Sequence, residues 1–341
     1  MLAFVTGGTG FVGSNLVAAL VKRGIGVRVL RRSTSSLTAL DGLDFQTCVG
    51  DVLDEVDTLT AAMAGCDWVF HTAAISDYWR YRGQNRLYRT NVGGTRNMLA
   101  AALRAGVGRF VLTSSLAALG VPEPGHLLTE SNTFNLRPRQ FPYGYSKHLA
   151  EAELRLAVAA GLEAVAVNPS VVIGPGDLNR TESAMFVQAA RGRLRVAAPG
   201  GTNFVAVGDV VAGHIAAAER GRAGEHYILA GENLSFREAF ATVNDIAGRP
   251  GPRVVLPAWT IPVAAAAVGA ARFVVGPRLP LGGKQMRLSS VGIYADGSKA
   301  RTELGVPYTP FRTAAQSAYD WYLENHYLPE QAADPRARTR R

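Results

Sequence analysis

Two side chains one helical turn apart have the chemistry of a proton donor and a nearby cation. The stretch Tyr143-Gly-Tyr-Ser-Lys147 places a phenol and an ammonium on one face of a helix, whereas Tyr145 points elsewhere. Acid–base work near neutrality requires the phenol pKa to fall by about three units from about 10, roughly 4 kcal/mol. An ammonium about 4 Å away at an effective dielectric of about 20 supplies that much. The pair predicts a general acid/base, Tyr143, activated by Lys147; the alternative is a solvated surface pair.

A glycine-rich turn near the N-terminus could hold phosphates. The residues Thr6-Gly7-Gly8-Thr9-Gly10-Phe11-Val12-Gly13 follow an apolar run and open a helical pattern. Gly7 allows the tight turn, Gly10 removes a side chain that would block a pyrophosphate, and Gly13 lets the helix pack close to the sheet. Free N–H groups at the start of that helix attract phosphates. In this strand–helix setting the motif predicts a dinucleotide site.

The residues after the second predicted strand indicate which dinucleotide binds. The strand over residues 27–30 is followed by Arg31-Arg32-Ser33, whereas an enzyme that uses NAD has an Asp or Glu there for the ribose 2′-hydroxyl. A guanidinium can pair with a 2′-phosphate, which a carboxylate would repel. We therefore expect NADP as cofactor, with NAD less favoured; the alternative is that Arg31 and Arg32 are ordinary surface arginines.

Short apolar runs alternate with helical patterns along the first half of the chain. We expect strands over residues 2–5, 27–30, 68–70, 109–112 and 164–167, and helices over residues 14–22, 91–104 and 145–160. Such alternation implies right-handed crossovers and a parallel sheet covered on both faces. The predicted fold class is α/β, a doubly wound parallel (Rossmann) sheet with a smaller, discontinuous α+β substrate lobe.

The pattern changes after about residue 168, where glycine–proline clusters interrupt the chain. We expect an NADP-binding domain over residues 1–176 plus 203–220, a substrate lobe over residues 177–202 plus 221–328, and a flexible basic tail over residues 329–341. The apolar stretch 258–275 contains Pro262 and Arg272 and is weak for a membrane-spanning helix. A buried or lid helix is expected there, and peripheral contact with a membrane surface stays open.

Composition excludes several classes of protein. Of the 341 residues, 48% are hydrophobic and 18% charged, which excludes disorder over most of the chain. Two cysteines and scattered histidines offer no disulfide scaffold and no metal-ligand spacing, so no metal site is expected. The net charge of +9 comes in part from an arginine cluster at the C-terminus, and the rest of the sequence has no long basic run with interleaved aromatic residues. No nucleic-acid partner is therefore expected. No targeting segment precedes the first strand, and a cytoplasmic location is expected.

Further motifs give the chain a family resemblance. Asp51-Val52, His71-Thr72-Ala73-Ala74, Asn91-Val-Gly-Gly-Thr95, Thr113-Ser114-Ser115 and Tyr143…Lys147 follow the glycine turn in that order. The chain thereby resembles the extended short-chain dehydrogenases/reductases of the NAD-dependent epimerase/dehydratase family, to about residue 328. A narrower likeness, to the dihydroflavonol reductase-like group with its hopanoid-associated sugar epimerases, rests on segments 166–175, 231–238 and 298–305.

The resemblance implies roles for individual residues. Ser115 would hydrogen-bond the substrate oxygen, Lys147 would also hold the nicotinamide ribose, and Asn91 would support the active-site helix or simply cap it. A homodimer through paired helices is implied as well. The expected cofactor contacts are Gly7, Thr9, Gly10, Phe11, Val12, Gly13, Arg31, Arg32, Asp51, Val52, Thr72, Ala73, Ala74, Thr113, Tyr143, Lys147, Pro169, Val171 and Val172.

Three departures from the family pattern bear on the reaction. Ser115 precedes Leu116-Ala117-Ala118 and not the acidic pair of sugar-nucleotide dehydratases. Asn203 stands where sugar-nucleotide epimerases place an arginine, although Asn168 is retained where they use an asparagine near the substrate. An epimerase keeps its oxidised cofactor, usually NAD, bound through its cycle. The arginine pair instead favours NADPH that exchanges with solution, as a reductase with net turnover of the cofactor requires.

The walls of the expected substrate site are apolar. Trp79 lies in an aromatic loop, and the small lobe contributes Trp259, Ile261, Val263, Val268, Phe273 and Val274. Such walls suit a hydrophobic or ring-shaped ketone, with Ser115, Trp79 and Asn168 as substrate contacts; alternatively the lobe residues form its core. The leading hypothesis is an NADP(H)-dependent reductase of a ketone or aldehyde. The alternatives are a sugar or nucleotide-sugar epimerase and a non-catalytic NADP-binding regulator, and the retained Tyr–Lys pair argues against the latter.

Overall fold

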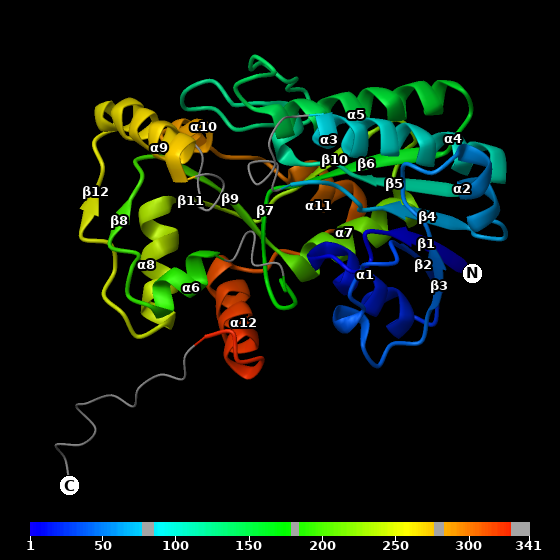
Figure 1. Cartoon of the computed structure of the whole chain (residues 1–341), viewed down its shortest axis with the longest axis horizontal. Coiled ribbons are helices and arrows are strands. Elements are labelled where there is room, and N and C mark those ends of the chain that lie inside the picture. The colour runs from blue at the N-terminus through cyan, green and yellow to red at the C-terminus, as the bar shows by residue number, and fades with distance from the viewer. Residues whose placement is uncertain (77–84, 179–183, 276–282, 329–341) are drawn as a thin grey trace, which may run out of the picture.

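A parallel sheet of seven strands forms the centre of the protein (Figure 1). The structure is a computed structural model that describes residues 1–76, 85–178, 184–275 and 283–328. In spatial order the strands are β10 (His226–Leu229), β6 (Ala164–Pro169), β5 (Arg109–Thr113), β4 (Trp68–His71), β1 (Leu2–Thr6), β2 (Gly26–Arg31) and β3 (Gln46–Val49). The order reverses beside β1 and every pairing is parallel, which confirms the predicted doubly wound sheet.

Helices cover both faces of this sheet. One face packs against α2 (Val56–Ala62), α4 (Thr95–Ala105) and α5 (Pro142–Ala159), and the other against α1 (Phe11–Lys22), α7 (Val207–Arg220) and α11 (Ser298–Leu304). Within β1, Ala3 and Val5 belong to one hydrophobic cluster and Phe4 to the other. Successive side chains of a strand point to opposite faces, so a strand buried on both sides is apolar throughout.

A second, smaller sheet extends from the carboxyl edge of the first. It consists of β11 (Glu232–Ser235), β9 (Gly201–Ala206) and β13 (Gly292–Ile293), with β7 (Val171–Ile173) paired to β9. The helices α6 (Ala184–Ala190), α8 (Phe236–Ile246) and α12 (Phe311–Glu324) enclose a third core, in which the Phe204 and Phe311 rings lie 4.9 Å apart. A capping box of Ser235 and Glu238 fixes the start of α8.

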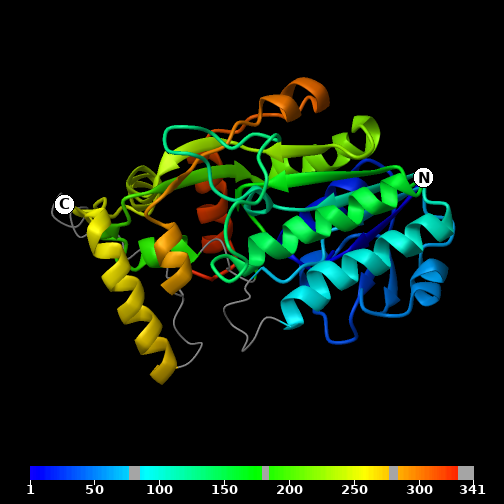
Figure 2. The ribbon, with the colours of Figure 1, turned by 90° about the horizontal axis from the view of Figure 1, so that it is seen from above.

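The remaining elements lie at the edges of this lobe and around the site. They are β8 (Val196–Ala197), β12 (Val254–Val255), α3 (Asn85–Tyr88), α9 (Ile261–Val275), α10 (Gly283–Leu288), the π-helical turn η3 (Arg89–Gly94) and the 3-10 turns η1 (Thr38–Leu40), η4 (Leu116–Leu119) and η5 (Ala258–Thr260). Figure 2 shows α9 projecting from the body of the molecule. Among the described helices, none has the length and apolar character needed to cross a bilayer.

The structure differs from the sequence-based expectations in three places. Strand β3 was not expected, because its outer residues are exposed at a sheet edge and carry little apolar signal. The helix expected over 91–104 begins with the π-helical turn η3. The stretch 258–275 is not a buried helix: Trp259 is 76% and Val263 68% exposed, so neither lies in the core of the lobe.

The expected division into two domains stays a prediction. Strand β10, which falls within the range 221–328 of the expected substrate lobe, is hydrogen-bonded to β6 in the main sheet. Strand β9 pairs in the smaller sheet, and α7 directly after it packs on the main one. The chain therefore crosses between the sheets more often than the pattern indicated. Trp79 and the expected tail 329–341 lie outside the described residues.

Candidate functional site

The glycine-rich turn joins β1 to α1 at the carboxyl edge of the sheet. Gly7 has a φ of +67°, and a Cβ there would lie 2.7 Å from the backbone nitrogen of Ala73. A Cβ on Gly13 would collide with the carbonyl oxygen of Gly7. These two glycines are therefore required by the fold of the turn itself, through a left-handed conformation and a close approach of helix to strand.

Gly10 differs from its neighbours because its missing side chain leaves space above the turn. A Cβ at this position would approach only the Gly7 carbonyl oxygen, at 3.2 Å. Gly10 is the N-cap of α1, and no side chain caps that end of the helix. The N–H groups of the first turn, including those of Phe11 and Val12, have no intrahelical acceptors. An open cradle of N–H donors at a helix N-terminus fits a pyrophosphate.

The end of β2 contains a buried donor atom that has no acceptor among the described residues. Arg31 is the last residue of β2, and its Nε is buried without a hydrogen-bond partner in the described part of the chain. Its Nη1 donates to the carbonyl oxygen of Arg32 at 3.4 Å, and Arg32 itself is exposed. Burying an unpaired donor of a cation is costly, so this end of β2 fits an anionic ligand group.

The other residues expected at the cofactor surround the glycine turn. The Thr72 hydroxyl donates to the Thr6 carbonyl oxygen at 2.7 Å, and the Ala73 N–H donates to the Thr6 hydroxyl at 3.2 Å. Asp51 accepts the Leu53 N–H at 3.0 Å, which shapes the loop after β3. The same loop holds the buried Val52, and Ala74 follows Ala73 in the loop after β4. Both loops therefore lie at the carboxyl edge of the sheet.

Lys147 is buried one turn into α5 and reaches the end of β5. Its Nζ donates to the carbonyl oxygen of Thr113 at 2.8 Å. Burial lowers the pKa of Lys147 to about 8, although the Glu151 carboxylate opposes this shift. The lysine therefore keeps its positive charge at neutral pH while lying close to loss of its proton.

His71, at the end of β4, stays neutral close to this lysine. Burial, and then the charge of Lys147, lower the pKa of His71 to about 3. Its Nε2 lies 3.1 Å from the Thr95 hydroxyl, which itself donates to the Asn91 carbonyl oxygen. Nε2 therefore donates, and Nδ1 accepts from the Thr6 hydroxyl at 2.7 Å. The imidazole is a structural link between β1, β4 and the start of α4.

Tyr143 lies in the first turn of α5, one turn before Lys147. Pro142 begins this helix, and the ring of Tyr143 is half-buried beside that of Phe141. Tyr145 is instead part of an aromatic cluster, 5.5 Å from the Phe134 ring. The two tyrosine rings thus have different neighbours, as their spacing of two residues on a helix predicts.

The two serines after β5 have different environments. The Ser114 hydroxyl is buried and donates to the Glu151 carboxylate. Ser115 is half-buried, caps η4, and accepts the Ala117 N–H at 3.2 Å. The hydroxyl hydrogen of Ser115 is free for a second interaction, because only its oxygen is used by the cap. Of the pair, Ser115 therefore has the environment that suits a substrate contact.

The neighbouring strand β6 contributes the buried Asn168 next to the Ser115 loop. Its residue Asn168 is fully buried, donating to the Ser115 carbonyl oxygen at 3.0 Å and to Glu151 at 2.6 Å. Its Oδ1 is also buried and has no partner among the described residues. Pro169 ends this strand, and Val171 and the buried Val172 begin β7. Asn168 therefore positions the Ser115 loop.

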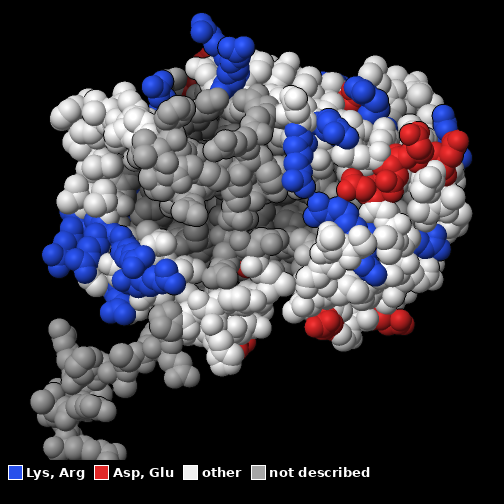
Figure 3. Space-filling view, in the orientation of Figure 1, with Lys and Arg blue, Asp and Glu red and all other residues white. Residues whose placement is uncertain are grey.

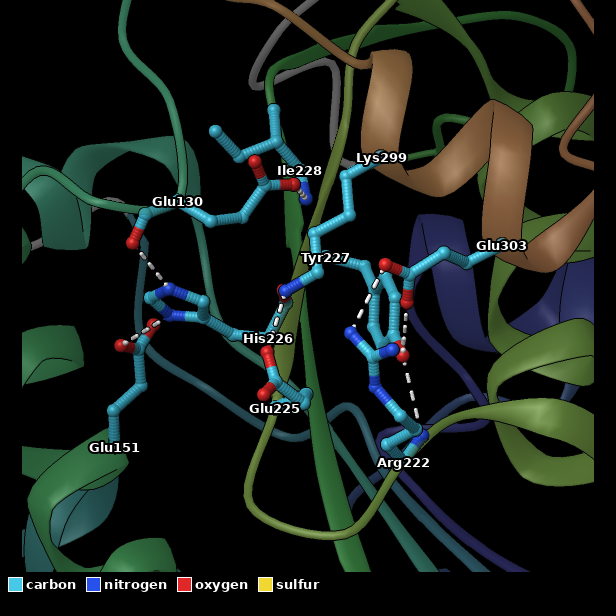
Figure 4. Close-up of polar contacts among 9 residues, drawn as sticks. All are labelled: Glu130, Glu151, Arg222, Glu225, His226, Tyr227, Ile228, Lys299 and Glu303. Carbon is cyan, nitrogen blue, oxygen red and sulfur yellow. Dashed lines mark hydrogen bonds and ion pairs between the residues drawn. The ribbon is translucent and has the colours of Figure 1, made fainter.

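Sequence reasoning missed a buried ionic network behind these residues. Glu151 lies one turn beyond Lys147 on α5, and its Oε2 is 3.4 Å from His226 Nδ1 (Figure 4). The other ring nitrogen of His226 donates to the Glu130 carbonyl oxygen at 2.8 Å. Burial raises the pKa of Glu151, but hydrogen bonds from His226 and Ser114 outweigh it and leave the pKa below its usual range. The i, i+4 spacing from Lys147 was the available signal.

Asn91 links the loop after β4 to the active-site helix. It lies in the π-helical turn η3, where its Oδ1 accepts the Ile75 N–H at 2.8 Å. Its Nδ2 donates to the Ile75 carbonyl oxygen and to the Ser146 hydroxyl, both at 3.0 Å. Single π-helical turns are rare and occur frequently at functional sites. Asn91 thus does more than cap a helix.

No group of three or more His, Cys, Asp or Glu side chains within 1–76, 85–178, 184–275 and 283–328 is arranged to hold a metal ion. The polar side chains of this region include instead the Tyr143 phenol, the Lys147 ammonium and the Ser115 hydroxyl. A dinucleotide cradle with such a set at its carboxyl edge is the architecture of NAD(P)-dependent oxidoreductases and epimerases.

Comparison with known proteins places the chain among these enzymes. Residues 3–230 match the model of the NAD dependent epimerase/dehydratase family, and the chain belongs to that family. A Synechocystis protein named "Putative dihydroflavonol 4-reductase" is 38% identical over 96% of both chains. "Sterol demethylase protein B" of Methylococcus capsulatus is 33% identical over 95% of this chain and 99% of its own. The crystal structure of gox2253 superposes with a TM-score of 0.84 at 36% identity, covering 96% of this chain and 99% of that one.

Proposed function

We propose that the protein is an NADP(H)-dependent reductase that converts a ketone or aldehyde on a hydrophobic or ring-shaped molecule to an alcohol. The observation that carries this proposal is the buried Lys147 ammonium, held on the Thr113 carbonyl oxygen one turn from Tyr143. The one-turn spacing on α5 supports a cation close to the Tyr143 phenol, at the end of β5 in the main sheet. A family member with such a pair has the groups needed to move a proton to a carbonyl oxygen.

The residues have distinct tasks in the proposed reaction. A nicotinamide coenzyme in the glycine cradle would supply the hydride. Tyr143 gives its phenolic proton to the substrate oxygen as that oxygen becomes an alkoxide, and the Lys147 charge lowers the free energy of the phenolate left behind. The Ser115 hydroxyl donates a hydrogen bond to the same oxygen and fixes its direction.

The choice of NADP over NAD follows from the end of β2. The buried, unpartnered Nε of Arg31 and the exposed guanidinium of Arg32 would pair with a 2′-phosphate. The described residues at the end of this strand include no carboxylate for a ribose 2′-hydroxyl, because Ser33, Thr34 and Ser35 follow the arginines. A phosphate there would give the orphan donor an acceptor.

The substrate class is supported by Asn203. Its side chain is fully buried: Oδ1 accepts from the Ser170 hydroxyl at 2.7 Å and from the Gly231 N–H at 2.9 Å, and Nδ2 donates to Asn233 Oδ1 at 2.8 Å. The position therefore joins three segments and offers no cation to a diphosphate-linked sugar. The names of the two full-length relatives, which refer to a dihydroflavonol and a sterol, also favour a ring-shaped apolar substrate.

The test is a screen of cyclic ketones, aldehydes and sugar nucleotides that follows NADPH absorbance. Wild type should consume NADPH with a cyclic or hydrophobic carbonyl compound. Tyr143→Phe should lower kcat by at least about 100-fold while the NADPH dissociation constant stays within about twofold. Tyr145→Phe is the matched control and should remain active. Conversion of a sugar nucleotide without net NADPH loss would instead identify an epimerase, and full activity of Tyr143→Phe would exclude this residue as the acid.

A further inference from the structure

The region before and along α9 exposes apolar side chains that the core does not use. Trp259 is 76% and Val263 68% exposed. On α9, Ile261 and Ala265 face the protein and are buried, whereas Pro262, Val263, Ala266 and Ala267 are exposed. The helix is thus anchored by one side and presents its other apolar side to the surroundings. Such a contiguous patch marks an interaction site.

A basic surface adjoins this apolar one along the chain and in space. The short pair β8–β12 is bordered by the exposed side chains of Arg193, Arg195, Arg249 and Arg253. The Arg253 N–H donates to the Arg195 carbonyl oxygen at 2.9 Å, so these two residues are neighbours. Strand β12 leads through η5 directly into α9. Charge and apolar surface are therefore parts of one structural unit.

The figures show both features on the same face. Figure 2 shows α9 extending toward the viewer of Figure 1, and Figure 3 shows a cluster of Lys and Arg atoms over the edge that carries β8 and β12. Acidic atoms gather on the opposite side of that view and not within the cluster. The β8–β12 strands add exposed Val196 (48%) and Val254 (51%) between the arginines.

The arginines of this surface are not neutralised within the described part of the chain. Ion pairs in that part link other arginines, such as Arg312 with Asp245 at 2.7 Å, but none of them involves Arg193, Arg195 or Arg253. Arg195 donates only to a backbone carbonyl, that of Gly192 at 3.0 Å. The positive charge is therefore available to an external anion.

We propose that this surface, made of Trp259, the exposed side of α9 and the β8–β12 arginines, docks the protein onto an anionic lipid bilayer. An interfacial helix of this kind lies with its apolar side among the acyl chains, while arginines meet the lipid headgroups. Tryptophan favours the same boundary because its ring is apolar and its N–H is polar. The docking is peripheral and does not depend on the proposed reductase activity.

The test measures binding of the full-length protein to vesicles by sedimentation. Vesicles of phosphatidylcholine with 30% phosphatidylglycerol, a composition chosen for the assay, should bind the protein, and pure phosphatidylcholine should bind it far more weakly. Arg193→Gln/Arg195→Gln/Arg253→Gln should weaken binding by about 100-fold, since each basic residue near an anionic surface contributes about fivefold. Trp259→Ser/Val263→Ser should weaken it at least about tenfold.

A control variant separates this surface from general charge and hydrophobicity. Arg155→Gln/Leu156→Ser changes an exposed arginine and a 67% exposed leucine on α5 and should leave vesicle binding unchanged. All substitutions are on exposed side chains, so unfolding temperatures should agree within a few degrees. The proposal would be overturned if all variants bound equally or if binding did not depend on phosphatidylglycerol. It would also be overturned if wild type bound no vesicles and instead formed a dimer that Trp259→Ser/Val263→Ser dissociates, or if wild type captured RNA in place of vesicles.

Discussion

Replacing Glu151 by glutamine removes one buried charge and nearly preserves the shape of the side chain. In the wild type, one carboxylate oxygen accepts from Ser114 and Asn168, and the other faces His226 Nδ1 at 3.4 Å. The amide oxygen of Gln can keep the first two hydrogen bonds, while its NH2 group donates to a neutral His226. The second nitrogen of His226 can still donate to the Glu130 carbonyl oxygen. The substitution therefore isolates the charge of Glu151.

The sign of the effect on stability follows from the histidine. The hydrogen bond to Glu151 raises the pKa of His226 above its ordinary value, although burial opposes the shift. A raised folded-state pKa gives stability that is fully present below the unfolded pKa, about 6.5, and is lost as pH rises through the folded pKa. The His226 side chain is 24% exposed and the contact is long, so the pair contributes about 1 kcal/mol, less than the roughly 1.5–3 kcal/mol of a well-formed hydrogen bond to a charged group.

The assay is urea unfolding at pH 5.5 and at pH 8. Wild type should lose about 1 kcal/mol more unfolding free energy over this interval than Glu151→Gln. The buried His71 and His214, whose pKa values are lowered to about 3 and about 4, add stability as pH rises through the unfolded pKa of about 6.5. They do so equally in wild type and variant, so their contribution cancels from the difference. Glu153→Gln on the same helix, which breaks an exposed pair with Arg96, is the control and should keep the wild-type slope. The reasoning is refuted if Glu151→Gln keeps that slope too.

Three further substitutions test the cofactor cradle and its lysine. Gly13→Ala places a methyl group against the Gly7 carbonyl oxygen. It should lower the free energy of unfolding by about 1–3 kcal/mol and abolish coenzyme binding in a titration. The control Gly208→Ala, whose added Cβ would meet no neighbouring atom within 4 Å, should do neither. The double variant Arg31→Gln/Arg32→Gln should weaken NADPH by at least about tenfold and NADH much less in the same titration; equal losses would contradict the 2′-phosphate role. Burial lowers the pKa of Lys147 to about 8, so kcat/KM should fall above about pH 8 as the cation is lost. An active Lys147→Arg variant should move that fall to higher pH. A fall in kcat/KM at the same pH in both proteins would count against the lysine.

The sheet and the glycine turn could be predicted because local sequence determines them. Apolar runs such as Leu2–Thr6 are buried on both faces, and only glycine suits the positive φ of Gly7. The Tyr143–Lys147 pair was predicted from helix periodicity, and its role stays a prediction. These features depend on neighbours in the chain, which a sequence displays directly.

Long-range features could not be read in the same way. The His226 ring meets Glu151 across 75 residues, and Asn203 meets Asn233 across a strand pairing whose register no local pattern reveals. A buried or lid helix was expected over residues 258–275, and burial was included because apolar composition is the usual sign of a core helix. Its exposure depends on where the lobe ends in space, which composition does not encode.

The buried amide of Asn203 constrains how this chain could acquire a different specificity. It bridges the turn after β6, the strand β9 and the start of β11, so a bulky cation at this position would separate all three. In directed evolution toward diphosphate-linked sugars, the arginine that binds the diphosphate would therefore have to arise at another position. The junction thus directs adaptation toward positions whose side chains can change without disturbing these three segments.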